Sequence, residues 1–138
     1  NLEEEYRAKM VQIEFDEQFY LVFFNADANL LELCLEKLLD NAVRYSPHAG
    51  IVTVQSVSED EVLKIMITDQ GDGFSDKALR NLFGVFEIGD KHVDNTIGLN
   101  LAIVKQIVDY HGGTVSVVNL PQKGATVTIS IPQQPDRE

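Results

Sequence analysis

One predicted helix, LEKLLDNAVRYSP, carries a line of polar residues whose types could do chemistry. Positions three and four apart share a helix face, so Lys37, Asn41 and Arg44 lie together, with Asp40 and Tyr45 beside them. An ammonium, an amide and a guanidinium in one line form a local cluster of donors that could face an anionic ligand. The alternative is an ordinary solvated helix face, which is the commoner meaning of such a pattern.

Two later stretches favour a binding site over a solvated face. In ITDQGDGF, Asp69 stands at the end of an apolar strand and is followed by Gly71 and Gly73. Glycine at these positions lets the backbone turn with positive φ or approach a flat ligand closely, although a tight turn alone would also use it. In the second stretch, Gly98 is expected to open a helix after an irregular segment, where free backbone amides form an anion site.

The elements that must position these residues follow from periodicity. Alternation predicts strands at 11–16 and 20–25 as a hairpin-like pair, and a helix capped by Asp27 or Asn29 runs until Pro47 ends it. Two strands, GIVTVQSVS and VLKIMITD, meet at the turn EDE. A short helix at about 76–82 and an irregular segment at 83–97 come next.

The C-terminal third is expected to be one helix and one hairpin. The helix starts at Gly98 and is capped by Gly112 or Gly113, and the strands TVSVVN and GATVTISIP are joined by LPQK. This order predicts an α+β fold, a two-layer α/β sandwich with helices on one face of a mixed, mostly antiparallel sheet.

Composition narrows the class of protein. A chain of 138 residues with 44% hydrophobic and 24% charged residues fits one globular domain, and no apolar run reaches the ~18 residues of a membrane span. A net charge of −11 argues against a nucleic-acid binder, so a polyanionic ligand would need local cations, a metal or backbone amides. The lone Cys34 excludes an internal disulfide, favours a reducing cytoplasmic setting and is expected in the core. An asparagine at position 1 suggests that residues 1–138 are a fragment of a longer chain.

Four stretches in this order resemble one family. LLDNAVRYSP resembles an asparagine box, DQGDGF a first glycine box, LFGVF a phenylalanine box, and GLNLAIVKQIVDYHGG a second glycine box with its helix. Together they are similar to the ATP-binding catalytic domain of sensor histidine kinases, within the ATPase group of DNA gyrase, the ninety-kilodalton heat-shock chaperone and the mismatch-repair ATPases. The resemblance covers nearly the whole chain and implies a Bergerat-type ATP-binding fold.

The resemblance also implies roles for residues on the helix. Asn41 would ligate a Mg²⁺ that bridges the phosphates, and Arg44 would reach phosphate oxygens, so both are candidate catalytic residues. Lys37 stands where the family usually has asparagine, and its ammonium would pair with phosphate or repel the metal. Tyr45 would pack along the adenine.

The two glycine boxes would hold the base and the phosphates. Asp69 would accept a hydrogen bond from the exocyclic amino group of adenine, and Gly71 and Gly73 would let the backbone come close to the base. The phosphates would be held by Gly98 and the adjacent amides of Leu99 and Asn100.

Three departures from the family pattern concern the chemistry more than the binding. Besides Lys37, the second glycine box has Thr96 and Asn100 in place of glycines, and β-branched threonine should resist a left-handed backbone. Ile88 replaces an arginine that assists the γ-phosphate, for which Lys91 or His92 could substitute. Lost charge at the γ-phosphate slows transfer while adenine recognition survives.

The resemblance implies a protein-histidine kinase module with ATP and Mg²⁺ as cofactors. It would transfer the γ-phosphoryl to a histidine on a separate dimerisation domain and serve a downstream response regulator, in the cytoplasm and without membrane contact of its own. The alternative is a pseudokinase that binds nucleotide without transfer. An ATPase clamp is disfavoured because Lys37 replaces the glutamate of gyrase-like relatives, and a serine-kinase anti-sigma factor would also need that acid. His111 is expected to have a structural role at a helix end.

Overall fold

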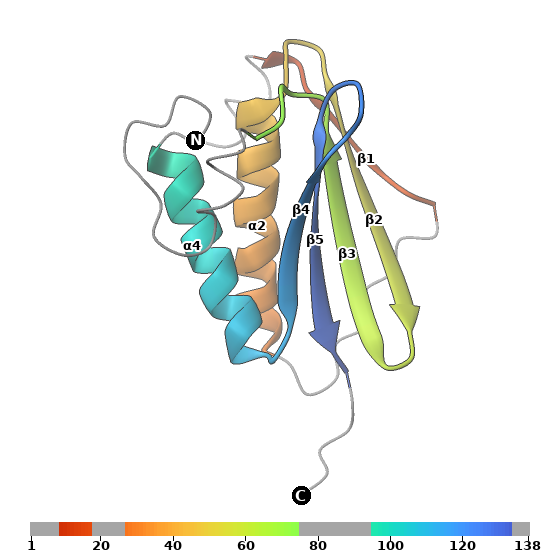
Figure 1. The fold of residues 1–138 in the computed structure, drawn as a ribbon, viewed down its shortest axis with the longest axis vertical. Helices are drawn as coiled ribbons and strands as arrows, with labels where there is room; N and C mark the ends of the chain where they lie inside the picture. Colours follow the sequence, from red (N-terminus) through yellow and green to blue (C-terminus); the bar gives the residue numbers. More distant parts are fainter. Residues whose placement is uncertain (1–8, 18–26, 75–94, 134–138) are drawn as a thin grey trace, which may run out of the picture.

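The computed structural model describes residues 9–17, 27–74 and 95–133. These form two helices and a five-stranded sheet with the order β1-β2-β3-β5-β4. In chain order the elements are β1 (Gln12–Phe15), α2 (Ala28–Tyr45), β2 (Ile51–Glu59), β3 (Val62–Asp69), α4 (Asn95–Tyr110), β4 (Thr114–Asn119) and β5 (Ala125–Pro132). Both helices cover the same face of the sheet (Figure 1), so the expected two-layer α+β architecture is confirmed.

The sheet is mixed, as expected. Strand β1 pairs with β2 in parallel, and the other pairings, β2 with β3, β3 with β5 and β4 with β5, are antiparallel. The β2–β3 hairpin closes through Asp60 and Glu61, both with positive φ, which matches the right-handed twist of the flanking strands. The predicted strand at 20–25, the helix at 76–82 and the phenylalanine box lie outside the described residues, so the first predicted hairpin has no outcome.

The core lies between the sheet and the helices. In α2 the buried side chains Leu31, Cys34, Leu38 and Ala42 recur at spacings of three and four, and they face the alternating apolar residues of β2, β3 and β5. Cys34 is fully buried, which confirms its expected place in the core. Burial raises the pKa of its thiol to about 12 and keeps it protonated.

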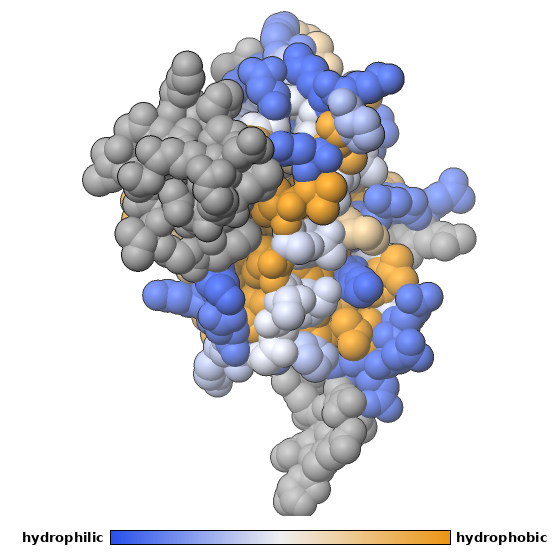
Figure 2. All heavy atoms as spheres, viewed as in Figure 1, coloured by the Kyte–Doolittle hydropathy of each residue, from blue (hydrophilic) through white to orange (hydrophobic). Residues whose placement is uncertain are grey.

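The two helices run antiparallel (Figure 1) and pack against each other. Asp27 caps α2 by accepting a hydrogen bond from the backbone N–H of Leu30, which decides between the two predicted caps. Gly112 follows α4 with φ +73°, the left-handed conformation expected there. On the face shown in Figure 2, hydrophobic residues reach the surface along the middle and hydrophilic residues surround them.

The start of α4 corrects one prediction. The helix begins at Asn95, three residues before Gly98, so residues 95–97 are not part of an irregular segment. Thr96 and Asn100 therefore have helical backbone, and the expected conflict with a left-handed conformation at Thr96 does not arise. No helix in the described parts of the chain is both long and apolar enough to cross a membrane.

Candidate functional site

The C-terminal half of α2 brings the predicted polar line together. Lys37 is half-buried, Asn41 is only 5% exposed, and Arg44 lies one turn further along the helix. The guanidinium Nε of Arg44 donates to Asp40 Oδ1 at 3.0 Å, with both side chains shielded from most solvent. The ion pair holds Arg44 along the helix, so its charge stays beside Asn41.

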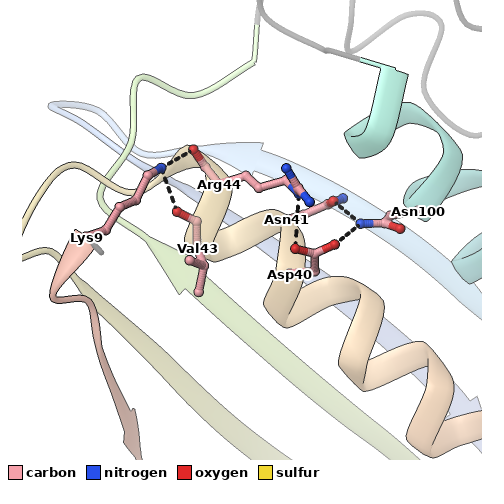
Figure 3. A network of polar contacts seen from close by, with 6 residues as sticks. All are labelled: Lys9, Asp40, Asn41, Val43, Arg44 and Asn100. Carbon is pink, nitrogen blue, oxygen red and sulfur yellow. Dashed lines mark hydrogen bonds and ion pairs between the residues drawn. The ribbon is translucent and has the colours of Figure 1, made fainter. Parts of the chain in front are cut away.

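Asn100 joins this line to the second helix (Figure 3). Its side-chain Nδ2 donates to Asp40 Oδ2 at 2.9 Å and to Asn41 Oδ1 at 2.8 Å. An ionised carboxylate only accepts hydrogen bonds, so the Asn100 atom that faces Asp40 must be the nitrogen. The second proton of that nitrogen then requires oxygen at the facing atom of Asn41. The network therefore fixes which way the Asn41 amide points.

This contact gives Asn100 a place that the sequence did not predict. The side chain is 4% exposed and reaches across to α2. The backbone amides of Leu99 and Asn100 lie beyond the four free N–H groups of a helix that starts at Asn95, so the expectation that they stand free at a helix start was wrong. Gly98 lies in the first turn, and the Leu99 side chain is exposed.

Asp69 ends β3 with its side chain buried, 4% exposed. Its Oδ1 accepts a hydrogen bond from the backbone N–H of Gly71 at 2.8 Å. Burial raises the pKa of this carboxyl to about 6, and the backbone N–H groups of Gly71 and Ala125 oppose the rise. A carboxylate in such a place is a strong acceptor for a donor that arrives from a ligand, because water competes little there.

The loop after β3 is packed against the ends of α2 and β4, and this explains both glycines by contacts within the protein. A Cβ on Gly71 would overlap the backbone carbonyl of Tyr45. Gly73 has φ +82°, and a Cβ there would meet Asn119 Oδ1 at 2.8 Å. The ring of Tyr45 meets the ring of Phe74 edge to face, with centroids 4.8 Å apart. Tyr45 is thus fixed between the helix end and the loop.

Asn119 is a second residue that the sequence analysis missed. At the end of β4, its Oδ1 accepts from the backbone N–H of Phe74 at 2.9 Å, and its Nδ2 donates to the carbonyl of Phe74 at 2.8 Å. This two-bond bracket fixes the loop that follows Asp69. In the sequence Asn119 precedes LPQK, and asparagine is common in ordinary turns, so no local signal indicates this contact.

The polar side chains of this site suit a Mg²⁺ whose ligands are mainly phosphate oxygens and water. Among the described residues there is no group of three His, Cys, Asp or Glu side chains that could hold a metal by itself. Asn41 Oδ1 accepts a hydrogen bond from Asn100, and an amide oxygen is one of the hard ligands that Mg²⁺ takes. Mg²⁺ in nucleotide sites takes most of its ligands from phosphates and water, so one protein oxygen fits that chemistry.

Comparisons with known proteins identify a family for this chain. Residues 26–135 match the family described as "Histidine kinase-, DNA gyrase B-, and HSP90-like ATPase". Sensor protein KdpD of Escherichia coli (strain K12) is 35% identical over 115 residues, 83% of this chain and 13% of that protein. Sensor histidine kinase WalK of Bacillus subtilis (strain 168) is 31% identical over 122 residues, 85% of this chain and 20% of that protein. The chain thus spans a fifth or less of the length of these two relatives.

Solved structures share the fold. The mycobacterial sensor histidine kinase MprB superposes with a TM-score of 0.76 at 30% identity and covers 98% of this chain and 92% of that chain. Histidine kinase ThkA in complex with response regulator protein TrrA gives 0.77 at 21% identity, covering 99% of this chain and 38% of that chain. The four sequence boxes, the two-layer fold and the family match over residues 26–135 lead to one conclusion. The chain belongs to the family of histidine kinase-, DNA gyrase B- and HSP90-like ATPases.

Proposed function

We propose that this chain is the catalytic domain of a sensor histidine kinase, which binds ATP and transfers its γ-phosphoryl group to a histidine on a separate dimerisation domain. The observation that carries the proposal is the meeting of two kinds of polar group at one end of the α2–α4 pair. The line Asn41, Arg44 and Asn100 suits phosphates and a metal, and the buried carboxylate of Asp69 suits a base.

Adenine recognition is assigned to Asp69. Its carboxylate would accept a hydrogen bond from the exocyclic amino group of adenine. Guanine has an oxygen at that position, so two acceptors would face each other. Tyr45, held edge to face against Phe74, presents the rest of its ring to the base. Gly71 and Gly73 act here through the loop shape, since the space beside each is taken by Tyr45 and Asn119.

The phosphates are assigned to cations and to helix amides. Arg44 and Lys37 supply positive charge from α2 in a chain whose net charge is −11. The free N–H groups in the first turn of α4, which includes Gly98, add donors from the second helix. These groups would together hold the triphosphate.

Mg²⁺ would be held by Asn41 Oδ1 together with phosphate oxygens and water, and it would neutralise charge on the phosphates. Asn100 holds the Asn41 amide in one orientation at 2.8 Å, so the metal would share that oxygen with the Asn100 N–H. Arg44 supplies the protein's own charge beside this point.

The partners come from the family and from the relatives. A dimerisation domain elsewhere in a longer chain would present the acceptor histidine, and a response regulator would take the phosphoryl group onward. The ThkA structure contains a response regulator, TrrA. Phosphotransfer here depends on positioning and charge, because the protein does little covalent chemistry in such a step.

A second candidate, a nucleotide-binding pseudokinase, is favoured by one observation. Lys37 stands one helical turn before Asn41, and the metal-facing oxygen of Asn41 already accepts a hydrogen bond from Asn100. If the ammonium of Lys37 replaces the metal charge, ADP binds equally well with and without Mg²⁺. The kinase proposal expects binding that Mg²⁺ strengthens.

Calorimetric titration with ADP, first with Mg²⁺ and then with a chelator, separates the two candidates. Phosphotransfer is then measured by adding ATP and a histidine-bearing dimerisation domain and detecting acid-labile histidine phosphate. Stronger binding with Mg²⁺ and an acid-labile product support the kinase. Metal-indifferent binding without product supports the pseudokinase, and no nucleotide binding at all contradicts both.

A further inference from the structure

Lys9 makes three hydrogen bonds to the C-terminal end of α2, of which those to Val43 and Arg44 are drawn in Figure 3. Its ammonium Nζ donates to the backbone carbonyls of Val43 at 2.9 Å, Arg44 at 2.6 Å and Ser46 at 3.1 Å. An ammonium has three N–H donors, so all of them are used on one helix end. The side chain lies in the segment before β1, more than thirty residues away in sequence.

The sequence explains why the helix end has room for this cation. The last carbonyls of a helix have no intrahelical donor. The Ser46 backbone N–H serves Ala42 and Val43, and the Ser46 hydroxyl also serves Ala42. Pro47 has no N–H, so the chain beyond Ser46 cannot continue the ladder, and Lys9 supplies the donor for the carbonyl of Arg44. Positive charge also suits the C-terminal end of a helix dipole.

The backbone around Lys9 is tied to the same place. The carbonyl of Lys9 accepts from the N–H of Ala49 at 2.6 Å, and the N–H of Gln12 donates to Gly50 at 3.0 Å. Main chain and side chain therefore hold the turn after α2 from two sides. The same last turns of the helix carry Asn41, Arg44 and Tyr45. A shift of this end would move all three side chains.

We propose that Lys9 is a positioning residue whose ammonium occupies a three-carbonyl cation site and holds the last turn of α2 in the geometry that nucleotide binding requires. The effect on binding rests on the proposed function, since it assumes that the nucleotide contacts Asn41, Arg44 and Tyr45. The cation site itself stands on the three hydrogen bonds alone.

The first test is the substitution Lys9→Met, which keeps much of the side-chain length and removes the three N–H donors and the charge. We expect the affinity for ADP to fall by about threefold to tenfold at a temperature where both proteins are folded, because a less ordered site binds more weakly. The matched control is Lys105→Met. Lys105 pairs with Asp109 on the exposed side of α4 at 2.8 Å, and its loss should leave ADP affinity unchanged.

A rescue experiment separates positioning from general stabilisation. In Lys9→Ala, ethylammonium should enter the emptied space, donate to the three carbonyls and restore ADP affinity. Tetramethylammonium at the same ionic strength carries the same charge without N–H groups and should not restore it. Lys9→Gln, which retains two N–H donors, should have intermediate affinity and covers the case in which Lys9→Met fails to fold.

Two results would overturn the inference. One is an affinity of Lys9→Met for ADP within about twofold of the wild type, which is less than a positioning role requires. The other is equal rescue by both cations. Failure of the wild type to bind ADP would count against the proposed function instead, and hydrogen exchange at the Ser46 amide would still test the cation site. That amide should exchange faster in Lys9→Met than in the wild type and Lys105→Met.

Discussion

Polar side chains link α2 and α4 at both ends of the pair, but the two ends use them differently. At one end Asn100 donates to Asp40 and Asn41. At the other, His111 lies against the first residues of α2: its Nε2 accepts from the backbone N–H of Asp27 at 3.0 Å, and its Nδ1 faces the carbonyl of Ile107 at 2.8 Å. A carbonyl only accepts, so Nδ1 carries the proton and the neutral ring serves both helix ends.

The two networks differ in the kind of group that they join. The His111 end joins backbone groups at helix termini, which need partners in any folded protein. At the other end, Asn100 binds two neighbouring side chains of α2. This end of α2 also contacts the loop at Gly71, which follows the buried carboxylate of Asp69. A fold gains nothing from burying that charge, which supports the binding role that we propose for this end.

The largest expected effect comes from Asp69→Asn. The asparagine side chain has one acceptor oxygen fewer than the carboxylate, and its N–H₂ group would repel the amino group of adenine. ADP affinity should therefore fall by about a hundredfold or more. The free energy of unfolding should stay the same or rise, because a costly buried charge is removed. Calorimetry and thermal unfolding on the same variant measure both. Loss of stability with unchanged ADP affinity would make Asp69 structural.

The pH dependence of stability should show the same residue. The pKa of Asp69 is raised from 3.8 to about 6 in the folded protein, so the folded state binds the proton more tightly than the unfolded state. This contribution favours folding at pH values below about 4 and is lost as pH rises through about 6, a change of about 2–3 kcal/mol. Comparing urea unfolding of wild type and Asp69→Asn at pH 4 and pH 7.5 isolates most of this change. ADP affinity should rise over the same interval, because adenine needs the ionised carboxylate.

Two glycines with equally tight surroundings test whether the two ends of the helix pair differ in nucleotide binding. A Cβ on Gly71 would overlap the Tyr45 carbonyl, and a Cβ on Gly113 would overlap the Ser130 carbonyl. Each change to alanine should lower the free energy of unfolding by about 2–3 kcal/mol, since backbone must move. Only Gly71→Ala should also weaken ADP binding, because Tyr45 shifts with it. An equal loss of ADP affinity in both variants would show that overall stability, and not the site, is being measured.

The smallest effect is expected from the two linking side chains. Asn100→Ala removes one hydrogen bond from Asp40 and one from Asn41, and His111→Ala removes the acceptor of the Asp27 backbone N–H, so each should cost about 1 kcal/mol in stability. Asn100→Ala should also lower Mg²⁺-dependent ADP affinity by about threefold to tenfold, because the Asn41 amide is no longer held. His111→Ala should bind ADP as the wild type does. Thermal unfolding and calorimetry on the pair are the measurements.

Local patterns in the sequence predicted most of the fold. The spacing of Leu31, Cys34, Leu38 and Ala42 predicted α2, and alternation predicted the strands around it. The start of α4 was missed because NTIG lacks a clear hydrophobic period, and glycine in a first turn looks like a boundary. Side-chain contacts between distant elements were also out of reach.

Asn100 illustrates why the site was only partly predictable. Its departure from the glycine of the family pattern suggested a backbone problem, whereas its side chain bonds two residues about sixty positions earlier. Lys9 and Asn119 act over similar distances, at a helix end and in a loop, and neither has a neighbour in sequence that hints at its partner. Residue type and spacing found the groups of the site, and only the packing of α2 against α4 assigned their partners.

We propose that the end of the helix pair marked by Asn41, Asp69 and Asn100 binds nucleotide and that the end marked by Asp27 and His111 does not. Titrating the labelled protein with ADP and Mg²⁺ while recording amide resonances by NMR compares both ends in one experiment. We expect the amide resonances of Asn41, Asp69 and Asn100 to shift and those of Asp27 and His111 to stay unmoved. Shifts concentrated at Asp27 and His111, or none at saturating ADP, would contradict it.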